Sequence, residues 1–246
     1  MPGQYDRYQQ GFYQEVYDEF LAMQEHVFES HAYEEALLVA RAIMKRVRYN
    51  IELLIPRLHL MGYHFGEGFS EEPEEAAYWE QEAPIYKAPT SETPYLVVRL
   101  EQSAGILPLT LKCWYEEVGN VNFVGTFPVY ENRKERVADG SLLDPLFIYS
   151  VKMALTIGED NWSEINDISI APDRFFKYGY SEGGSYSIRT PCKMFDAPLE
   201  GYEVPEITFV NYLRLCFRWG GFPGLEKQHS LTAEKLEFLT KDLLPF

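Results

Sequence analysis

The sequence predicts an α+β fold in which a mixed or antiparallel sheet is flanked by helices and preceded by an N-terminal antiparallel helical hairpin. Two segments with a helical period come first, between residues 13 and 62. Short apolar runs with strand character fill the middle of the chain, and helical patterns return after residue 208. The chain of 246 residues is long enough to bury a substantial core.

Two apolar seams predict the helical hairpin, which we assign to residues 1–66. A break at Ser30, which can cap a helix, separates the seams, and Gly62 ends the second. Pro56 lies inside the second seam and predicts a kink or a break there. The seam residues are spaced three and four apart: Tyr13, Val16, Phe20, Met23 and Val27 in the first, and Leu37, Ala40, Met44, Val47, Ile51, Leu54, Leu58 and Met61 in the second.

The charges of the two hairpin helices are complementary and predict solvated pairing between them. A basic docking face on the second helix is the alternative, although acidic neighbours would neutralise it. The acidic set is Glu15, Asp18, Glu19 and Glu25, and the basic set is Arg41, Lys45, Arg46 and Arg48.

An acidic segment that contains several prolines and glycines predicts a linker over residues 67–92. The remaining residues, 93–246, form the predicted α+β domain. It begins with a helix over 94–103, which Thr93 caps and Gly105 ends. A second short helix is predicted from Leu109 to Val118.

The middle of the domain carries the predicted strands. Short strands are expected at Val121–Val124, at 127–130 and at Ile168–Ile170. The apolar run Leu146–Leu155 predicts a buried central strand, with a helix as the competing interpretation. Segments 174–180 and 185–189 flank a Ser-Glu-Gly-Gly turn and predict a β-hairpin.

Two helices complete the prediction. The first begins at Phe209 after the cap residue Thr208, and Gly220 and Gly221 end it. The second covers 232–240, with Thr232 as its cap. The apolar stripe of the first predicts a core helix, with a partner-binding groove at its glycine-rich end as the alternative; the stripe is Phe209, Tyr212, Leu213, Cys216 and Phe217.

No catalytic motif, metal site or cofactor site is predicted. The five histidines lack the i, i+4 spacing of a zinc helix, and Walker A and Rossmann patterns are missing from the sequence. No Gly-x-Ser-x-Gly stretch is followed by a predicted helix, as a nucleophile elbow requires. The three distant cysteines favour reduced thiols in a cytoplasmic protein. Acid–base catalysis by paired carboxylates stays open; the candidates are Asp139, Asp144, Glu159, Asp160, Glu164 and Asp167.

The net charge of −16 argues against direct binding to nucleic acid or to an anionic membrane. No apolar run approaches the roughly 20 residues that span a bilayer. Solubility alone could explain the charge. The alternative is a cationic protein partner that is steered toward the acidic surface.

The segment from Leu100 to Asn120 resembles the signature of the SUKH superfamily. In that signature a helix ends in glycine, a Leu-Pro pair turns the chain, and a second helix with an aromatic residue near its end runs to a glycine. The matching positions here are Gly105, Leu107, Pro108, Trp114, Tyr115 and Gly119. The superfamily includes bacterial immunity proteins that neutralise toxins and fungal regulators of cell-wall synthesis. The resemblance implies an α+β fold and a binding function with no shared catalytic residues.

The sequence therefore predicts a non-enzymatic bacterial immunity-type protein that binds a cationic toxin. A carboxylate-based enzyme and an acidic scaffold or nucleic-acid mimic are the alternatives. The hairpin turn and the glycine-rich corner after the penultimate helix are the predicted partner-binding surface. Its residues are Tyr178, Tyr180, Glu182, Gly183, Gly184, Trp219, Gly220 and Gly221.

Overall fold

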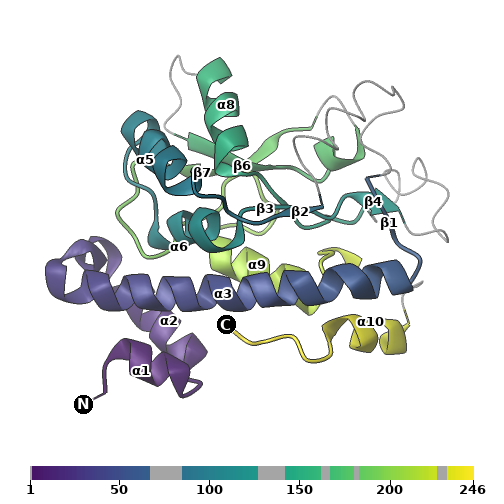
Figure 1. Ribbon diagram of the computed structural model, residues 1–246, viewed down its shortest axis with the longest axis horizontal. Coiled ribbons are helices and arrows are strands. Elements are labelled where there is room, and N and C mark those ends of the chain that lie inside the picture. Colours follow the sequence, from purple (N-terminus) through teal and green to yellow (C-terminus); the bar gives the residue numbers. More distant parts are fainter. Residues whose placement is uncertain (1, 67–84, 127–141, 162–166, 180–182, 226–231) are drawn as a thin grey trace.

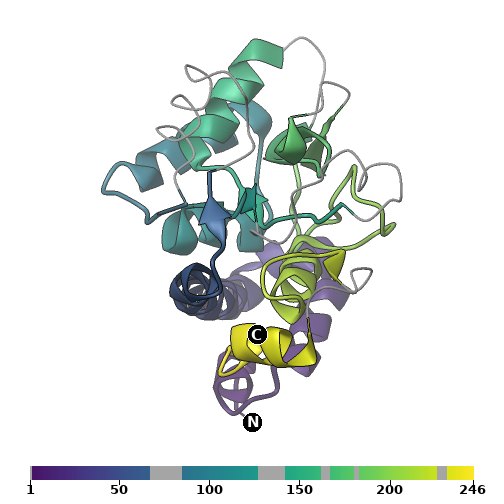
Figure 2. The same ribbon diagram turned by 90° about the vertical axis from the view of Figure 1, so that its right-hand side faces the viewer.

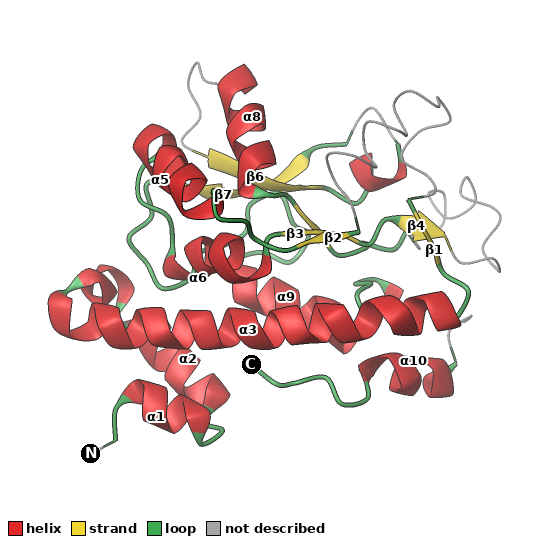
Figure 3. Ribbon diagram, in the orientation of Figure 1, coloured by secondary structure: helices red, strands yellow, loops and turns green. Residues whose placement is uncertain are grey.

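The computed structural model describes residues 2–66, 85–126, 142–161, 167–179, 183–225 and 232–246. It has the predicted α+β fold, with helices around several small antiparallel sheets (Figure 3). In Figures 1 and 2 the strands form a middle layer, with α5 (Thr93–Ala104) and α8 (Val151–Asn161) above it and α3 (Ser30–Leu60) and α9 (Phe209–Arg218) below it. Helices α1 (Gln4–Gln9), α2 (Tyr13–Ala22) and α10 (Ala233–Thr240) lie outside α3 and α9. The core is therefore enclosed between the strand layer and the long helix α3.

The N-terminal helices fold back along α3, as the two seams predict. The chain forms α1 (Gln4–Gln9), α2 (Tyr13–Ala22), a short 3-10 helix (Gln24–Phe28) and α3 (Ser30–Leu60). The backbone N–H of Tyr5 donates to Glu35 Oε2 at 2.8 Å, and the Arg46 guanidinium lies 4.4 Å from the centre of the Tyr13 ring. Val16, Phe20 and Val27 of the first seam are fully buried, and so is the second seam from Ala40 to Leu58 at each predicted position.

Helix α3 continues through Pro56, so the predicted break is wrong. Proline removes one backbone donor and crowds the preceding turn. Here Pro56 is exposed, while Leu54 and Leu58 on either side are fully buried. Arg57 also ties this part of α3 to the C-terminal helix by donating to the carbonyl oxygen of Leu239 at 2.9 Å. Tertiary packing therefore holds the helical conformation that the local sequence disfavours.

The predicted charge pairing between the two hairpin helices is also replaced by other contacts. Arg41 pairs with Glu116 at 3.1 Å, and Arg48 pairs with Glu52 one turn further along its own helix. Glu19 pairs with Arg7 of α1 at 2.7 Å. Arg41 thus reaches the helical turn after α6, while Arg48 stays on its own helix.

Within the described residues the strands form three small antiparallel sheets. β1 (His64–Phe65) pairs with β4 (Gly125–Thr126), and β3 (Asn120–Asn122) lies between β2 (Tyr86–Lys87) and β5 (Phe147–Ile148). The third sheet pairs β6 (Asp167–Pro172) with β7 (Ser185–Arg189). The backbone N–H of Tyr149 donates to the carbonyl of Ile170 at 2.8 Å, which joins β5 to β6. β2 thus lies at the end of the segment predicted as a linker, and the strand expected at 127–130 is outside the described residues.

Two strand predictions are wrong. The run Leu146–Leu155 contains the two-residue strand β5 before α8 (Val151–Asn161), so the competing helical interpretation holds for its second half. This segment is apolar except at Ser150 and Lys152, a pattern that buried strands and buried helices share. The predicted hairpin also has a different first strand. β7 pairs with β6, and the segment expected to be its partner contains a 3-10 helix, Phe176–Tyr178.

The remaining helices follow the capping signals except at the start of α5, where Glu92 and not Thr93 is the cap residue. α5 (Thr93–Ala104) ends at Gly105, and α6 (Leu109–Cys113) continues as a π-helical turn, Trp114–Val118, that ends at Gly119. α9 (Phe209–Arg218) and α10 (Ala233–Thr240) begin after Thr208 and Thr232, whose side chains accept hydrogen bonds from the first turn. All five residues of the predicted α9 stripe are buried.

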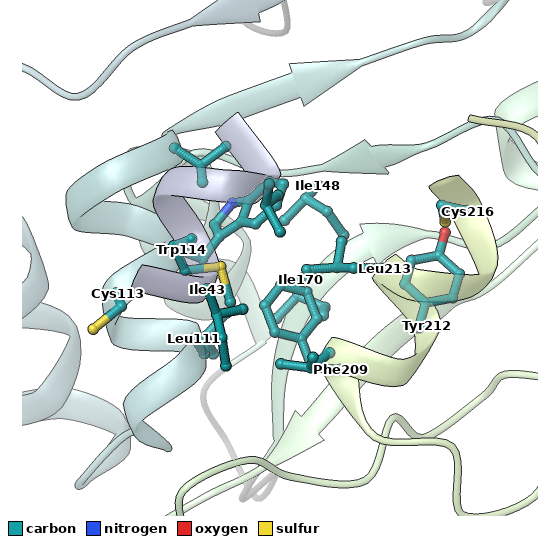
Figure 4. Close-up of a cluster of buried hydrophobic side chains, with 14 of the residues drawn as sticks. Ile43, Leu111, Cys113, Trp114, Ile148, Ile170, Phe209, Tyr212, Leu213 and Cys216 are labelled. Atoms are coloured by element: carbon teal, nitrogen blue, oxygen red, sulfur yellow. The ribbon is translucent and has the colours of Figure 1, made fainter. Parts of the chain in front are cut away.

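One apolar cluster extends from Tyr8 to Phe246 and includes residues of the hairpin and of the α+β part. Figure 4 shows its centre, where Trp114, Ile148, Phe209 and Leu213 point toward one another. The Trp114 and Phe209 rings meet edge to face, with their centres 5.6 Å apart. Helix α6, the strand layer and α9 therefore share a core with α3.

Candidate functional site

The connection between β6 and β7 carries several residues of the predicted partner surface. Asp173 closes it: its Oδ1 accepts from the backbone N–H of Phe176 at 2.8 Å, and its Oδ2 accepts from that of Gly184 at 2.6 Å. A Cβ at Gly183 would lie 2.4 Å from the backbone nitrogen of Phe176, so only glycine allows the two segments to approach this closely.

This connection presents two aromatic side chains to solvent. Phe175 is 37% exposed and Phe176 is 38% exposed, and the Arg174 guanidinium lies 4.9 Å from the centre of the Phe175 ring. Arg174 also forms an ion pair with Glu203, which connects the turn to the loop before α9. Phe175, Phe176 and the glycines 183 and 184 form what we call the aromatic turn. Tyr178 is half-buried beside it, and Tyr180 and Glu182 lie outside the described residues.

The glycine-rich corner after α9 faces the interior. Gly220 and Gly221 are buried with φ of 62° and 99°, and a Cβ on either would approach within 2.8 Å of Leu239 or Phe123 respectively. Trp219 is half-buried and packs against the core. The structure thus brings Gly183 and Gly184 together at the surface, while Gly220 and Gly221 are enclosed by other side chains.

Two carboxylates of the central part are buried in separate hydrogen-bond networks. Asp144 accepts from Lys177 Nζ at 2.5 Å and from the Tyr212 hydroxyl at 3.3 Å, and Lys177 has no exposed surface. Burial raises the pKa of Asp144, and the adjacent Lys177 charge opposes that shift. Both oxygens of Asp144 are therefore engaged by side chains of the core.

Asp196 is the second buried carboxylate, and it joins three helices. It accepts from the Tyr17 hydroxyl of α2 at 2.7 Å, from the Thr110 hydroxyl of α6 at 2.6 Å and from the backbone N–H of Val210 in α9 at 3.0 Å. Burial raises the pKa of Asp196, while the hydrogen bond from Thr110 lowers it most among the opposing contacts. Asp196 thus connects the hairpin to the α+β part.

Of the acidic residues considered for catalysis, the structure describes the side chains of Asp144 and Asp167, and the two have different partners. Asp167 lies at the start of β6, with an Arg189 nitrogen 3.9 Å from its carboxylate. The side chains of Asp139, Glu159, Asp160 and Glu164 lie outside the described part of the chain. Within the described ranges, no group of three or more His, Cys, Asp or Glu side chains could hold a metal ion.

The three cysteines are free, and burial raises the pKa of each thiol. The pKa reaches about 12 for Cys113 and about 11 for Cys192. A thiol with so high a pKa is protonated at neutral pH and is a poor nucleophile. The cysteines therefore contribute packing to the structure.

An open, mainly apolar groove of about 410 Å³ lies where the hairpin meets the signature segment. The beginning of α3 and the preceding 3-10 helix form one wall, and the end of α5 with the Leu-Pro turn and α6 forms the other. The groove is lined by Phe28, Ser30, Tyr33, Glu101, Ile106, Leu107, Leu109 and Lys112. We call it the hairpin groove.

Only indirect signals in the sequence point to the aromatic turn and the hairpin groove. Phe28 and Tyr33 are aromatic residues outside both apolar seams, so their rings are available for contacts outside the seams. Phe175 and Phe176 fall in a segment predicted as a strand, although Pro172-Asp173 before them is a turn signal. A side-chain acceptor directly after proline is what closes this turn in the structure.

The chain matches no protein-family model, no curated protein and no solved structure. The resemblance of residues 100–120 to the SUKH superfamily therefore stays a prediction. Among the helices of the described residues, none is both long enough and apolar enough to cross a membrane.

Proposed function

We propose that this protein is a non-enzymatic binding module that neutralises a cationic protein, in the manner of a bacterial toxin-immunity protein. The aromatic turn is the observation that carries this proposal. Its two phenylalanines are held at the surface by a turn that Asp173 and Gly183 define, although an apolar core lies nearby. Protein interfaces are enriched in aromatic residues, and such residues contribute much of their binding energy.

The charge of the chain supports a cationic partner. A net charge of −16 attracts a positively charged protein and accelerates its association at low ionic strength. The resemblance of residues 100–120 to the SUKH superfamily supports the same class of function. A cytoplasmic location accords with the three free thiols.

The hydrogen-bond networks favour binding over catalysis by carboxylates. Both buried aspartates accept hydrogen bonds from side chains inside the core. The donors to Asp144 are Lys177 and Tyr212, and the donors to Asp196 are Tyr17 and Thr110. A general acid or base needs to reach a substrate proton. Asp144 and Asp196 are 4% and 0% exposed, so they do not reach a substrate in solution. Their hydrogen bonds stabilise the fold instead.

The proposal is tested by affinity capture from the native host, with bound proteins quantified by mass spectrometry at low and high salt. We expect a basic protein to be enriched, less strongly at high salt, and to be lost with Phe175→Ser/Phe176→Ser. Phe12→Ser is the matched control, because Phe12 is 46% exposed at the other end of the chain. If no protein is enriched at any ionic strength, the proposed function is wrong.

A further inference from the structure

The hairpin groove has the composition of a site for one apolar side chain with polar flanks. Phe28 and Tyr33 are half-buried, and their ring centres lie 5.6 Å apart on the hairpin side. Leu107 and Leu109 of the signature segment are fully buried and form the floor, while Ile106 remains partly exposed. A space of about 410 Å³ with these walls accepts an aliphatic or aromatic side chain.

The lining of the groove is neutral, but carboxylates next to it in the chain give its surroundings a net negative charge at neutral pH. Its one lining cation, Lys112, is already paired, because its Nζ donates to Glu101 Oε2 at 2.9 Å. The residues adjacent in the chain add two more carboxylates: Glu29, whose side chain is 54% exposed, and the exposed Glu34. Counting histidine as neutral, the lining residues and their chain neighbours thus hold three carboxylates and one ammonium group.

We propose that the hairpin groove binds a segment of a cationic protein in which an apolar side chain is flanked by lysine or arginine. The apolar side chain fills the space between Tyr33 and Ile106, and a flanking cation pairs with Glu101 or Glu29. This inference rests on the proposed function, because that function identifies the partner as a protein. It adds a second contact surface, in the signature segment, to the aromatic turn.

A pair of synthetic peptides tests the site without the natural partner. Rhodamine-labelled acetyl-Lys-Leu-Trp-Lys-Leu-Lys-amide is titrated with the full chain and followed by fluorescence anisotropy, beside a version in which glutamate replaces every lysine. We expect the lysine peptide to bind and the glutamate peptide to bind at least about tenfold more weakly. Equal binding of the two peptides, or no binding of either, overturns the proposal.

The substitution Ile106→Glu separates groove binding from general attraction to an acidic protein. It blocks the apolar site and also adds one negative charge. Groove binding therefore predicts affinity lower by about tenfold or more, whereas general electrostatic attraction predicts affinity that is unchanged or higher. Leu60→Glu adds the same charge at the opposite end of α3, where Leu60 is 80% exposed and about 40 Å along the helix from Tyr33. It should leave binding unchanged.

Circular dichroism shows whether each variant is folded. If Ile106→Glu fails to fold, Tyr33→Ser takes its place, because it removes one wall without changing the charge. If neither substitution lowers the affinity, the groove is not the binding site.

The captured host protein distinguishes the two proposals. If Phe175→Ser/Phe176→Ser releases it and Ile106→Glu does not, the proposed function stands and the proposed groove site is wrong. If the lysine peptide binds in the groove but no host protein is captured, the groove stands and the function is wrong.

Discussion

Single polar side chains in the core decide how the parts of this protein are joined. Asp196 has no exposed surface and accepts hydrogen bonds from α2, α6 and the first turn of α9. Its carboxylate also lies at the N-terminal end of α9, where backbone N–H groups favour a negative charge. Tyr17 makes a further contact at 2.6 Å with the hydroxyl of Thr208, the capping residue of α9. The loss of one hydrogen-bond donor to Asp196 should therefore weaken the packing of several helices.

Tyr17→Phe should reduce the free energy of unfolding by about 1–3 kcal/mol, because the buried Asp196 carboxyl group loses a hydrogen-bond partner. Tyr49→Phe is the matched control, since Tyr49 is 46% exposed, and its effect should stay within about 0.5 kcal/mol. Urea titration followed by circular dichroism measures both. Equal stabilities of the two variants would mean that the Tyr17–Asp196 hydrogen bond contributes nothing to the fold.

The raised pKa of Asp196 predicts a sign for the dependence of stability on pH. Between the ordinary aspartate pKa of 3.8 and the raised folded-state pKa, the folded protein binds more protons at this residue than the unfolded chain does. The contribution of Asp196 to the free energy of unfolding is thus fully present below pH 3.8 and is lost as the pH rises through the folded-state pKa. Asn cannot titrate. The stability difference between the wild-type protein and Asp196→Asn should therefore shrink as the pH rises.

Urea titrations of both proteins from about pH 4 to about pH 7.5 measure this difference. Burial also raises the pKa of Asp144, which acts in the same direction. Both proteins retain Asp144, so its contribution cancels in the comparison. A difference that grows with pH would show that the ionised form of Asp196 is the stabilising one.

At the scale of elements, the structure departs from the sequence prediction where packing overrides local preference. The helix over Ser30–Leu60 was predictable from its seam, but its continuation through Pro56 was not, because the buried Leu54 and Leu58 hold it. The run Leu146–Leu155 gave no period that could separate strand from helix. Four capping signals lie where they were predicted, at Thr208, Thr232, Gly105 and Gly119. Ser30 and Thr93 are instead the first residues of their helices, and Glu29 and Glu92 before them are the N-caps.

Pro56→Ala should stabilise the protein. Alanine restores a backbone donor for the carbonyl of Glu52 and removes a residue that disfavours a helix interior by about 3 kcal/mol. A part of this gain, about 0.4–1 kcal/mol, is offset because proline also restricts the unfolded chain. Thermal melting should thus show a higher midpoint for Pro56→Ala, while Lys45→Ala at another exposed position of α3 leaves it nearly unchanged. A lower midpoint for Pro56→Ala would mean that proline is favoured at this position.

Trp114 and Trp219 should differ in their contribution to stability. Trp114 is fully buried at the end of α6, whereas Trp219 after α9 is half-buried. Trp114→Ala should cost about 3–5 kcal/mol, as expected for a large buried aromatic residue, and Trp219→Ala should cost less. Urea midpoints of the two variants measure the difference. Equal losses would indicate that the exposed part of Trp219 is covered in solution.

For the whole molecule, the order of helices, strands and helices was enough to predict the α+β class, and the antiparallel pairing follows it. The surfaces were harder to predict, because exposure depends on which segments meet. Gly183 and Gly220 look alike in the sequence, yet one lies beneath the exposed Phe176 and the other packs against Leu239. The hairpin groove combines residues 28–33 with residues 101–112, a contact that no local pattern encodes.

The shared core predicts that the hairpin and the α+β part unfold together. One apolar cluster contains Tyr8, Val47, Trp114 and Phe246, and the Asp196 network joins the same parts by hydrogen bonds. Differential scanning calorimetry should therefore show one transition in which the calorimetric and van't Hoff enthalpies agree. Tyr17→Phe should shift that transition to lower temperature as a whole. Two transitions, or one that splits in the variant, would show that the N-terminal hairpin is a separate folding unit that only rests on the α+β part.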